Sequence, residues 1–172
     1  TCDSWNNFNM LISYDWLKDF DKNPGTAEKV ADCLTMSIAE VEGIEDRAVA
    51  LKDFVIGRIE KISRHPNADK LQLAQVNIGS KSPVRVVCGA QNIYGGMLII
   101  FAPVGSRVKW HGQGEWVTLQ KATIRGEESH GMIAAAAEVG LETLKDPENG
   151  VLDLSPTKEK PGTPLTQALG LQ

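Results

Sequence analysis

Two strand-like runs separated by a short turn most constrain the fold of this chain. Residues 54–62 carry β-branched side chains with polar ones interleaved, as is typical of a half-buried strand. The string HPNADKL at residues 65–71 predicts a turn, because Pro66 fixes φ while Asn67 and Asp69 can bond their own backbone. Turn chemistry alone explains this string without any ligand.

The second run changes phase part-way along. Leu71 and Leu73 put apolar side chains on one face, whereas Val76 and Ile78 alternate in the opposite phase. An extra residue must intervene, so the pattern predicts a β-bulge near residues 74–75.

Further strand signals follow at short intervals. Apolar, β-branched runs alternate with glycine-containing turns at residues 84–88, 97–102, 116–119 and 122–125. With the two strands around the turn, this makes five or six antiparallel strands in roughly one hundred residues, enough for a small closed barrel without a long free edge. Residues 134–138 are good helix formers that precede Gly140.

The flanks of this barrel have a different character. Ser13 and Thr26 are expected to cap two helices, the first over residues 14–20 and the second with an apolar face against Trp16 and Phe20. A short strand at residues 151–154 and a helix at 163–170 follow the barrel.

Both flanks are too small to fold alone, so they are expected to pack together. The predicted organisation is a discontinuous domain of residues 10–50 and 147–172, with the barrel of residues 51–146 inserted into it. Residues 1–9 show no periodicity and are interpreted as a leader or an extension.

The formal net charge of −4 hides a strong asymmetry. Between Phe54 and Gly126 there are ten Lys and Arg against three Asp and Glu, a balance of +7, and the rest of the chain carries −11. Such a middle segment suits a polyanion. The plainer alternative is that a strand-rich segment is simply poor in acidic residues.

Several function classes find no support in the sequence. The chain shows no phosphate loop, dinucleotide fingerprint, nucleophile elbow or zinc-protease motif. Its three cysteines and three histidines are scattered, which predicts no metal site and reduced thiols. No apolar run approaches a membrane span, so a cytoplasmic location is expected. A basic small barrel without a catalytic centre is typical of a module that binds single-stranded or loop-rich nucleic acid.

Five strings, in order and spacing, resemble the tRNA-binding oligonucleotide/oligosaccharide-binding (OB) domain. They are HPNADKL at 65–71, VNIG at 76–79, VCGAQN at 87–92, IRGEESHGM at 124–132 and EVGL at 138–141. That domain occurs in bacterial phenylalanyl-tRNA synthetase β subunits, in the tail of some methionyl-tRNA synthetases and in free-standing tRNA-binding proteins. Two more strings, ISYDWLK at 12–18 and VEGI at 41–44, resemble the first group, so that the resemblance covers residues 10–172.

The resemblance implies a mainly β fold with some α structure, in which an OB-type five-stranded antiparallel barrel is inserted into a small helical α+β domain. It implies auxiliary tRNA binding for aminoacylation, by a fragment that is itself non-catalytic and holds no cofactor. The implied partners are tRNA, the rest of the β subunit and the α subunit, in a heterotetramer of two α and two β subunits, with no membrane. ATP and Mg²⁺ are implied for the full synthetase.

The predicted tRNA-binding residues fall into two groups. Cations expected to contact phosphate, with the loop rim beside them, are Lys61, Arg64, Lys70, Arg85, Lys121, Arg125, His65 and Asn67. The resemblance adds Asn92, Ser129, Met132 and Glu138. It also exposes a departure, since Ala134 and Ala135 stand where the family usually has a serine that could meet RNA or cap a helix.

Two other hypotheses remain open from the sequence. The barrel could be a structural, protein-docking module within a synthetase, or a free-standing tRNA-binding or chaperone homodimer. Trp110 and Trp116 are candidate platforms for base stacking, although burial in the barrel is the expectation for at least one of them.

Overall fold

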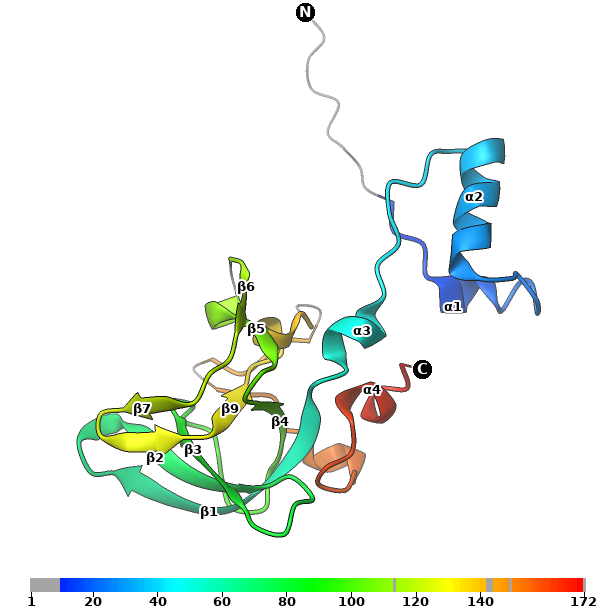
Figure 1. Cartoon of the computed structure of the whole chain (residues 1–172). Helices are drawn as coiled ribbons and strands as arrows, with labels where there is room; N and C mark the ends of the chain where they lie inside the picture. Colours follow the sequence, from blue (N-terminus) through cyan, green and yellow to red (C-terminus); the bar gives the residue numbers. More distant parts are fainter. Residues whose placement is uncertain (1–9, 113, 142–143, 149, 172) are drawn as a thin grey trace, which may run out of the picture. The chain divides into compact units, whose positions relative to one another are not determined.

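The computed structural model describes residues 10–112, 114–141, 144–148 and 150–171 (Figure 1). The chain divides into two compact units between Asp46 and Arg47. The predicted leader, residues 1–9, lies outside the described residues.

The first unit contains helices α1 (Tyr14–Leu17) and α2 (Ala27–Ser37). Both predicted caps are confirmed, because Ser13 Oγ accepts a hydrogen bond from the Trp16 N–H and Thr26 Oγ1 accepts one from the Lys29 N–H. Helix α1 is shorter than predicted, and neither helix contains a buried residue.

The second unit is built on a sheet of five antiparallel strands in the order β3-β2-β1-β4-β9. The strands are β1 (Val55–His65), β2 (Ala68–Asn77), β3 (Val84–Cys88), β4 (Leu98–Pro103) and β9 (Gly131–Ala134). The sheet curls until its two edges meet, where the His130 N–H donates to the Arg85 carbonyl over 2.9 Å. The predicted mainly β fold, a small and nearly closed antiparallel barrel, is confirmed.

Two hairpins occupy the long connection between β4 and β9. They are β5 (Arg107–Lys109) with β6 (Trp116–Thr118), and β7 (Ala122–Ile124) with β8 (Glu127–Ser129). The shorter elements are α3 (Arg47–Leu51), α4 (Leu165–Ala168), and the 3₁₀ turns η1 (Trp110–Gly112), η2 (Ala137–Val139) and η3 (Ser155–Thr157).

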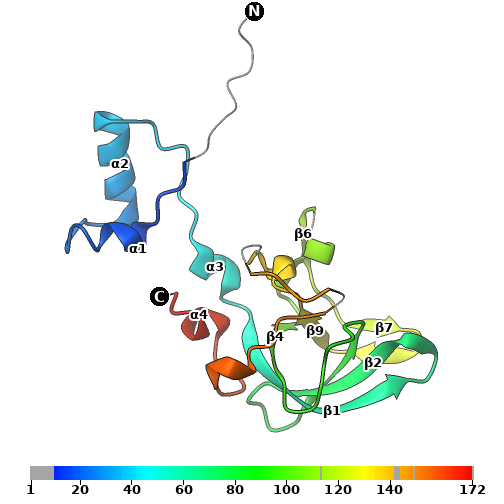
Figure 2. The same ribbon diagram turned by 180° about the vertical axis from the view of Figure 1, so that it is seen from behind.

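The barrel core is apolar and continuous with the chain that follows the barrel. Phe54, Ile56 and Ile100 are buried together with Leu165 of α4. The Leu165 N–H donates to the Phe54 carbonyl over 2.9 Å, and the Ile56 N–H donates to the Thr163 carbonyl over 2.8 Å. The last residues of the chain therefore pack against the start of β1, as both views show (Figure 2).

Two predicted elements are different in the structure. Residues 151–154 form no strand, because Val151 bonds the Asn92 side chain and only Leu154 among these described residues bonds a strand, through one hydrogen bond of 2.8 Å to the Leu98 carbonyl. Residues 134–138 form no α-helix, since Ala134 pairs in β9 and only the 3₁₀ turn η2 follows, ending at Gly140 with φ 84°. The discontinuous domain of residues 10–50 and 147–172 stays a prediction.

The β-bulge predicted near residues 74–75 of β2 lies instead in the neighbouring strand β1. Ile59 pairs with Val76 and Lys61 with Gln75, so that the extra residue is Glu60 in β1. Strand β2 alternates regularly from Leu73 to Val76, with Ala74 and Val76 buried, and a second register shift lies nearer the turn, between Arg64 and His65. Leu73 therefore shares the outer face with Gln75, instead of pointing into the core as its apolar character suggested.

Candidate nucleic-acid interface

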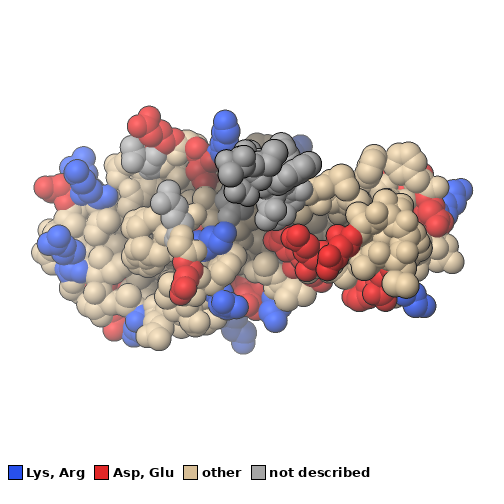
Figure 3. Space-filling view, turned by 90° about the horizontal axis from the view of Figure 1, so that it is seen from above, with Lys and Arg blue, Asp and Glu red and all other residues tan. Residues whose placement is uncertain are grey.

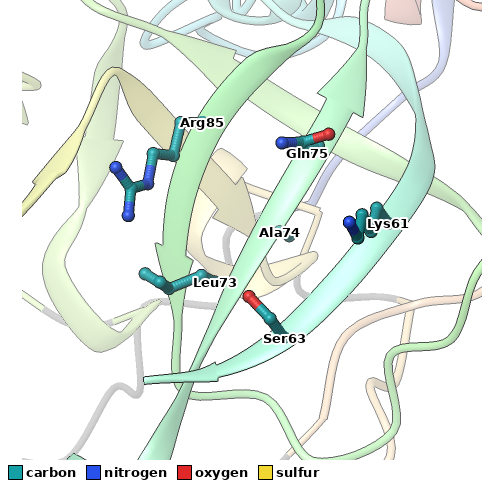
Figure 4. Close-up of a pocket in the computed structure, with 6 residues that line it drawn as sticks. All are labelled: Lys61, Ser63, Leu73, Ala74, Gln75 and Arg85. Atoms are coloured by element: carbon teal, nitrogen blue, oxygen red, sulfur yellow. The ribbon is translucent and has the colours of Figure 1, made fainter. Parts of the chain in front are cut away.

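The outer surface of β1, β2 and β3 carries the first cluster of predicted residues. Lys61 pairs with Gln75, which pairs with Arg85, so that these side chains form one row across three strands. With Ser63, Leu73 and Ala74 they line a shallow hollow of about 220 Å³ (Figure 4). We call Lys61, Ser63, Leu73, Gln75 and Arg85 the strand face. In the strand face, one cation lies on each side of the Gln75 amide, Lys61 on β1 and Arg85 on β3, and the apolar Leu73 lies on the same strand as Gln75.

A second cluster forms where the β1–β2 turn meets the β7–β8 turn. His65 is only 5% exposed, and its Nδ1 accepts a hydrogen bond of 3.1 Å from the Asn67 N–H. That bond leaves the proton on Nε2, which donates to the Ile124 carbonyl over 3.0 Å. Asn67 Nδ2 donates to the Arg125 carbonyl, also over 3.0 Å. His65 and Asn67 thus tie together two turns almost sixty residues apart in sequence.

This turn corner, residues 65–71 with 124–126, brings two cations together. A hollow of about 420 Å³ is lined by residues 67–71 and by Arg125, so Lys70 and Arg125 border the same space. Asp69 borders it as well. The ring of His65, which was predicted on the loop rim, is buried and links the two turns. Its contact with tRNA stays a prediction.

The predicted phosphate-contacting cations are not equivalent. Arg85 forms an ion pair with Glu127, and Lys121 pairs with Glu128 over 3.0 Å. Within the described ranges, no carboxylate forms an ion pair with Lys61, Arg64, Lys70 or Arg125, all of which are exposed. These four side chains are available to a polyanion without first breaking an ion pair.

Arg125 has an unusual backbone. Its φ is 52°, and Gly126 follows with a φ of 93°, so the two residues form a tight left-handed turn between β7 and β8. A non-glycine residue in this region costs roughly 1–2 kcal/mol. The turn nevertheless presents an arginine where Asn or Gly is favoured, which points to a role for the guanidinium.

Ser129 is not a surface residue. It is 4% exposed, its Oγ accepts from the Val87 N–H over 3.1 Å, and its hydroxyl donates to the Gly131 carbonyl over 2.9 Å. The hydroxyl therefore connects β3 to β9, the two edge strands that meet where the barrel closes. The buried backbone groups need this side chain, and its contact with tRNA stays a prediction.

The side chain of Asn92 also forms hydrogen bonds with backbone groups. Its Nδ2 donates to the Val151 carbonyl over 2.8 Å, and its Oδ1 accepts from the Val151 N–H over 3.0 Å. A Cβ on Gly150 would lie 2.6 Å from this Oδ1, so the Asn92 amide packs closely against Gly150 and leaves no room for a side chain there. Asn92 thus fastens the loop after β3 to the chain after the barrel.

Asn92→Ala is expected to lower the free energy of unfolding by about 1–3 kcal/mol, since two hydrogen bonds to Val151 are lost. Urea denaturation would measure this loss. Gln120→Ala serves as the control, because Gln120 is exposed and its side chain makes no hydrogen bond within the described part of the chain. An equal loss in both variants would contradict the assignment.

Met132 and Glu138 also belong mainly to the scaffold. Met132 is half-buried against the core, and Glu138 Oε2 accepts from the Ala135 N–H over 2.9 Å. Burial raises the pKa of Glu138, while backbone hydrogen bonds from Ala135 and His111 oppose that rise. Asp146 Oδ2 accepts from the Ala136 N–H over 2.8 Å, so two carboxylates cap this turn where a serine hydroxyl is missing.

The charge on the surface is divided into small groups. On the face of the barrel unit seen in Figure 3, Lys and Arg side chains are separated and have Asp and Glu among them. The residue count that gave +7 stopped at Gly126, just before the two glutamates that pair with Arg85 and Lys121. The strand face and the turn corner are thus the part of the basic segment best suited to phosphate. Arg64 precedes the turn corner in β1, but it pairs with Gln72 and alternates onto the opposite face of the strand from Lys61 and Ser63.

Sequence reasoning missed Ser63, Leu73 and Gln75 as members of the strand face. The missing signal was the position of the bulge, which decides which side chains of β2 point outward. The described residues contain no group of three or more His, Cys, Asp or Glu side chains that could hold a metal ion. No helix in the described part of the chain is long and apolar enough to cross a membrane.

Comparisons with known proteins find similarity over most of the chain. The family model described as a putative tRNA binding domain matches residues 54–164. The chain is 38% identical over 165 residues to the phenylalanine–tRNA ligase β subunit of Staphylococcus epidermidis, covering 94% of this chain and 20% of that protein. The corresponding protein of Rhodopseudomonas palustris is 41% identical over 146 residues, covering 84% of this chain and 17% of that protein. The chain thus spans about a fifth of the length of these relatives.

Proposed function

The chain belongs to the family of putative tRNA-binding domains, and from this membership we propose that it binds tRNA through the strand face, the turn corner and Arg64. The observation that carries the proposal is the group of exposed cations without ion pairs among the described residues: Lys61, Arg64, Lys70 and Arg125. Such contacts go mainly to phosphate, so they give affinity and orientation more than sequence specificity.

The barrel is proposed to be of the OB type. Its strand order, with β1 between β2 and β4 and with β9 beside β3, supports this assignment. In OB folds the face of the second and third strands and two of the loops bind oligonucleotides. Strand β2, strand β3 and the turn corner are the equivalent parts here.

The role of the longer protein is also a proposal. Similarity to β subunits of phenylalanine–tRNA ligases supports a place in that synthetase, where this region would assist tRNA binding during aminoacylation. The rest of the β subunit and an α subunit, in a heterotetramer of two α and two β subunits, would be its partners. ATP and Mg²⁺ would act elsewhere in the complex, and the location would be the cytoplasm.

Binding of bulk tRNA at low salt tests the proposal. The variant with Lys61, Arg64 and Lys70 changed to Ala is expected to lose most of the affinity. A control with Lys22, Lys29 and Lys160 changed to Ala removes the same charge from exposed positions outside the proposed interface. Equal losses in both variants, or no binding by the unmodified chain, would favour a protein-docking role over tRNA binding.

Arg125→Asn distinguishes the effect of backbone strain on stability from the effect of the guanidinium charge on tRNA affinity. The free energy of unfolding should rise by up to about 1 kcal/mol, because Asn tolerates the left-handed region better than Arg. The affinity for tRNA should fall, because a cation of the turn corner is lost. Arg125→Lys is the control and should keep both properties near their original values. Calorimetry and filter binding would measure the two effects, and an Asn variant with full affinity would contradict a role for the guanidinium.

A further inference from the structure

The hairpin of β5 and β6 carries an exposed aromatic side chain that the tRNA-binding surface described above does not use. Trp110 follows β5 directly and is 59% exposed, whereas Trp116 on the partner strand is half-buried. An indole is a large apolar group that usually buries much of its area. The exposed ring of Trp110 offers a flat surface on which a nucleic-acid base can stack.

The backbone around Trp110 is held in a specific and strained shape. His111 has a φ of 54° and a ψ of 28°, and its ring meets the Trp110 ring edge-on, with centroids 5.3 Å apart. A left-handed histidine costs energy that an ordinary hairpin tip avoids. The shape fixes where the Trp110 ring stands relative to its neighbour.

The tip is also anchored to the rest of the barrel unit. A Cβ on Gly112 would lie 2.6 Å from the Cβ of Ala137, so the tip packs tightly against η2. Glu138 of the turn η2 accepts a hydrogen bond from the Ala135 N–H. Burial raises the pKa of the Glu138 carboxyl, and the neighbouring His111 opposes that rise. Trp110 therefore stands on a preorganised support, which lowers the entropic cost of binding a ligand on its ring.

Two cationic side chains lie on the same hairpin as Trp110. Arg107 is exposed and pairs in register with Thr118, and Lys109 Nζ lies 5.3 Å from the ring centroid of Trp116. An aromatic face next to cations is the arrangement with which proteins hold single-stranded nucleic acid, the base on the ring and the phosphate on the cation. Paired bases are already stacked in their helix, so the ring suits an unpaired base.

Building on the proposed function, we infer that Trp110 stacks on an unpaired base of the bound RNA while Arg107 contacts a neighbouring phosphate. The other proposed contacts go mainly to phosphate. Stacking on Trp110 adds a contact that forms only where the RNA has an unpaired base.

The test compares a single-stranded RNA of about ten nucleotides, within the site size of a small barrel, with its blunt duplex and with tRNA. Trp110→Ala should weaken binding of the single strand and of tRNA by about 5- to 150-fold, the loss typical of one stacked base. Binding of the duplex should not change. Trp110→Phe keeps a ring and should lose less. The slope of affinity against salt should stay as in the unmodified chain, because stacking releases no counterions.

Trp16 offers a matched control, since it is 56% exposed and has an edge-on aromatic neighbour in Phe20, but lies in the other unit. Trp16→Ala should leave the affinities unchanged. An unchanged affinity of Trp110→Ala for the single strand, or an equal loss on the duplex, would overturn the platform. If tRNA binding then still depends on Lys61, Arg64 and Lys70, the proposed function stands alone. If the single strand binds through Trp110 but tRNA does not bind, only the platform stands.

Discussion

Raising the salt concentration fourfold should weaken tRNA binding by this chain about 50- to 150-fold, if four cations each neutralise one phosphate and contribute a slope of about 0.7–0.9. The four are Lys61, Arg64, Lys70 and Arg125, which have no ion pair among the described residues. With the first three changed to Ala, one contact remains, and the same salt step should weaken binding only about threefold. Filter binding or anisotropy titrations at two salt concentrations would give both numbers.

Two further variants sharpen this prediction. Arg85→Ala and Lys121→Ala should change the salt slope less than Lys61→Ala, because each of these cations already has a glutamate partner. A salt slope that stays the same after removal of Lys61, Arg64 and Lys70 would contradict the assigned surface. Equal slopes for the paired and unpaired cations would contradict the role given to Glu127 and Glu128.

Ser129→Ala should lower the free energy of unfolding by about 2–4 kcal/mol, since two buried backbone groups, the Val87 N–H and the Gly131 carbonyl, lose their partner. The loss falls on the seam that closes the barrel between β3 and β9. Chemical denaturation would measure it. The affinity of the folded variant for tRNA should stay unchanged, because the hydroxyl does not reach the surface.

Ser82→Ala is the matched control for this substitution. Ser82 is exposed in the loop between β2 and β3, so its change to Ala should stay within about 0.5 kcal/mol. A Ser129→Ala protein that keeps full stability but loses tRNA affinity would contradict the structural role and restore Ser129 as an RNA contact.

The barrel was predictable because its strands carry their own signals. Alternating β-branched runs and glycine turns indicated short antiparallel strands, and β1 to β4 form at those positions. The caps at Ser13 and Thr26 were predictable for the same reason, since each signal lies within a few residues of its effect. Such local features can be predicted without knowing which residues are in contact in the folded protein.

The errors concern features that depend on pairing between distant residues. The bulge was placed in β2 because Leu71 and Leu73 were read as core residues, whereas the extra residue is Glu60 in β1. The ion pair between Arg85 and Glu127 spans 42 positions and follows from the closure of the barrel. Polar residues in recognisable strings are ambiguous in the same way, because the groups that bind phosphate also satisfy buried backbone, as His65 and Ser129 do.

Mapping of backbone amide shifts in the ¹⁵N-labelled chain on addition of tRNA would locate the surface that binds tRNA. The largest changes are expected along β1 and β2 and in the turn corner, at Lys61, Arg64, Lys70 and Arg125, with α1 and α2 unaffected. Changes confined to α1 and α2, with β1, β2 and the turn corner undisturbed, would contradict binding of tRNA by this surface.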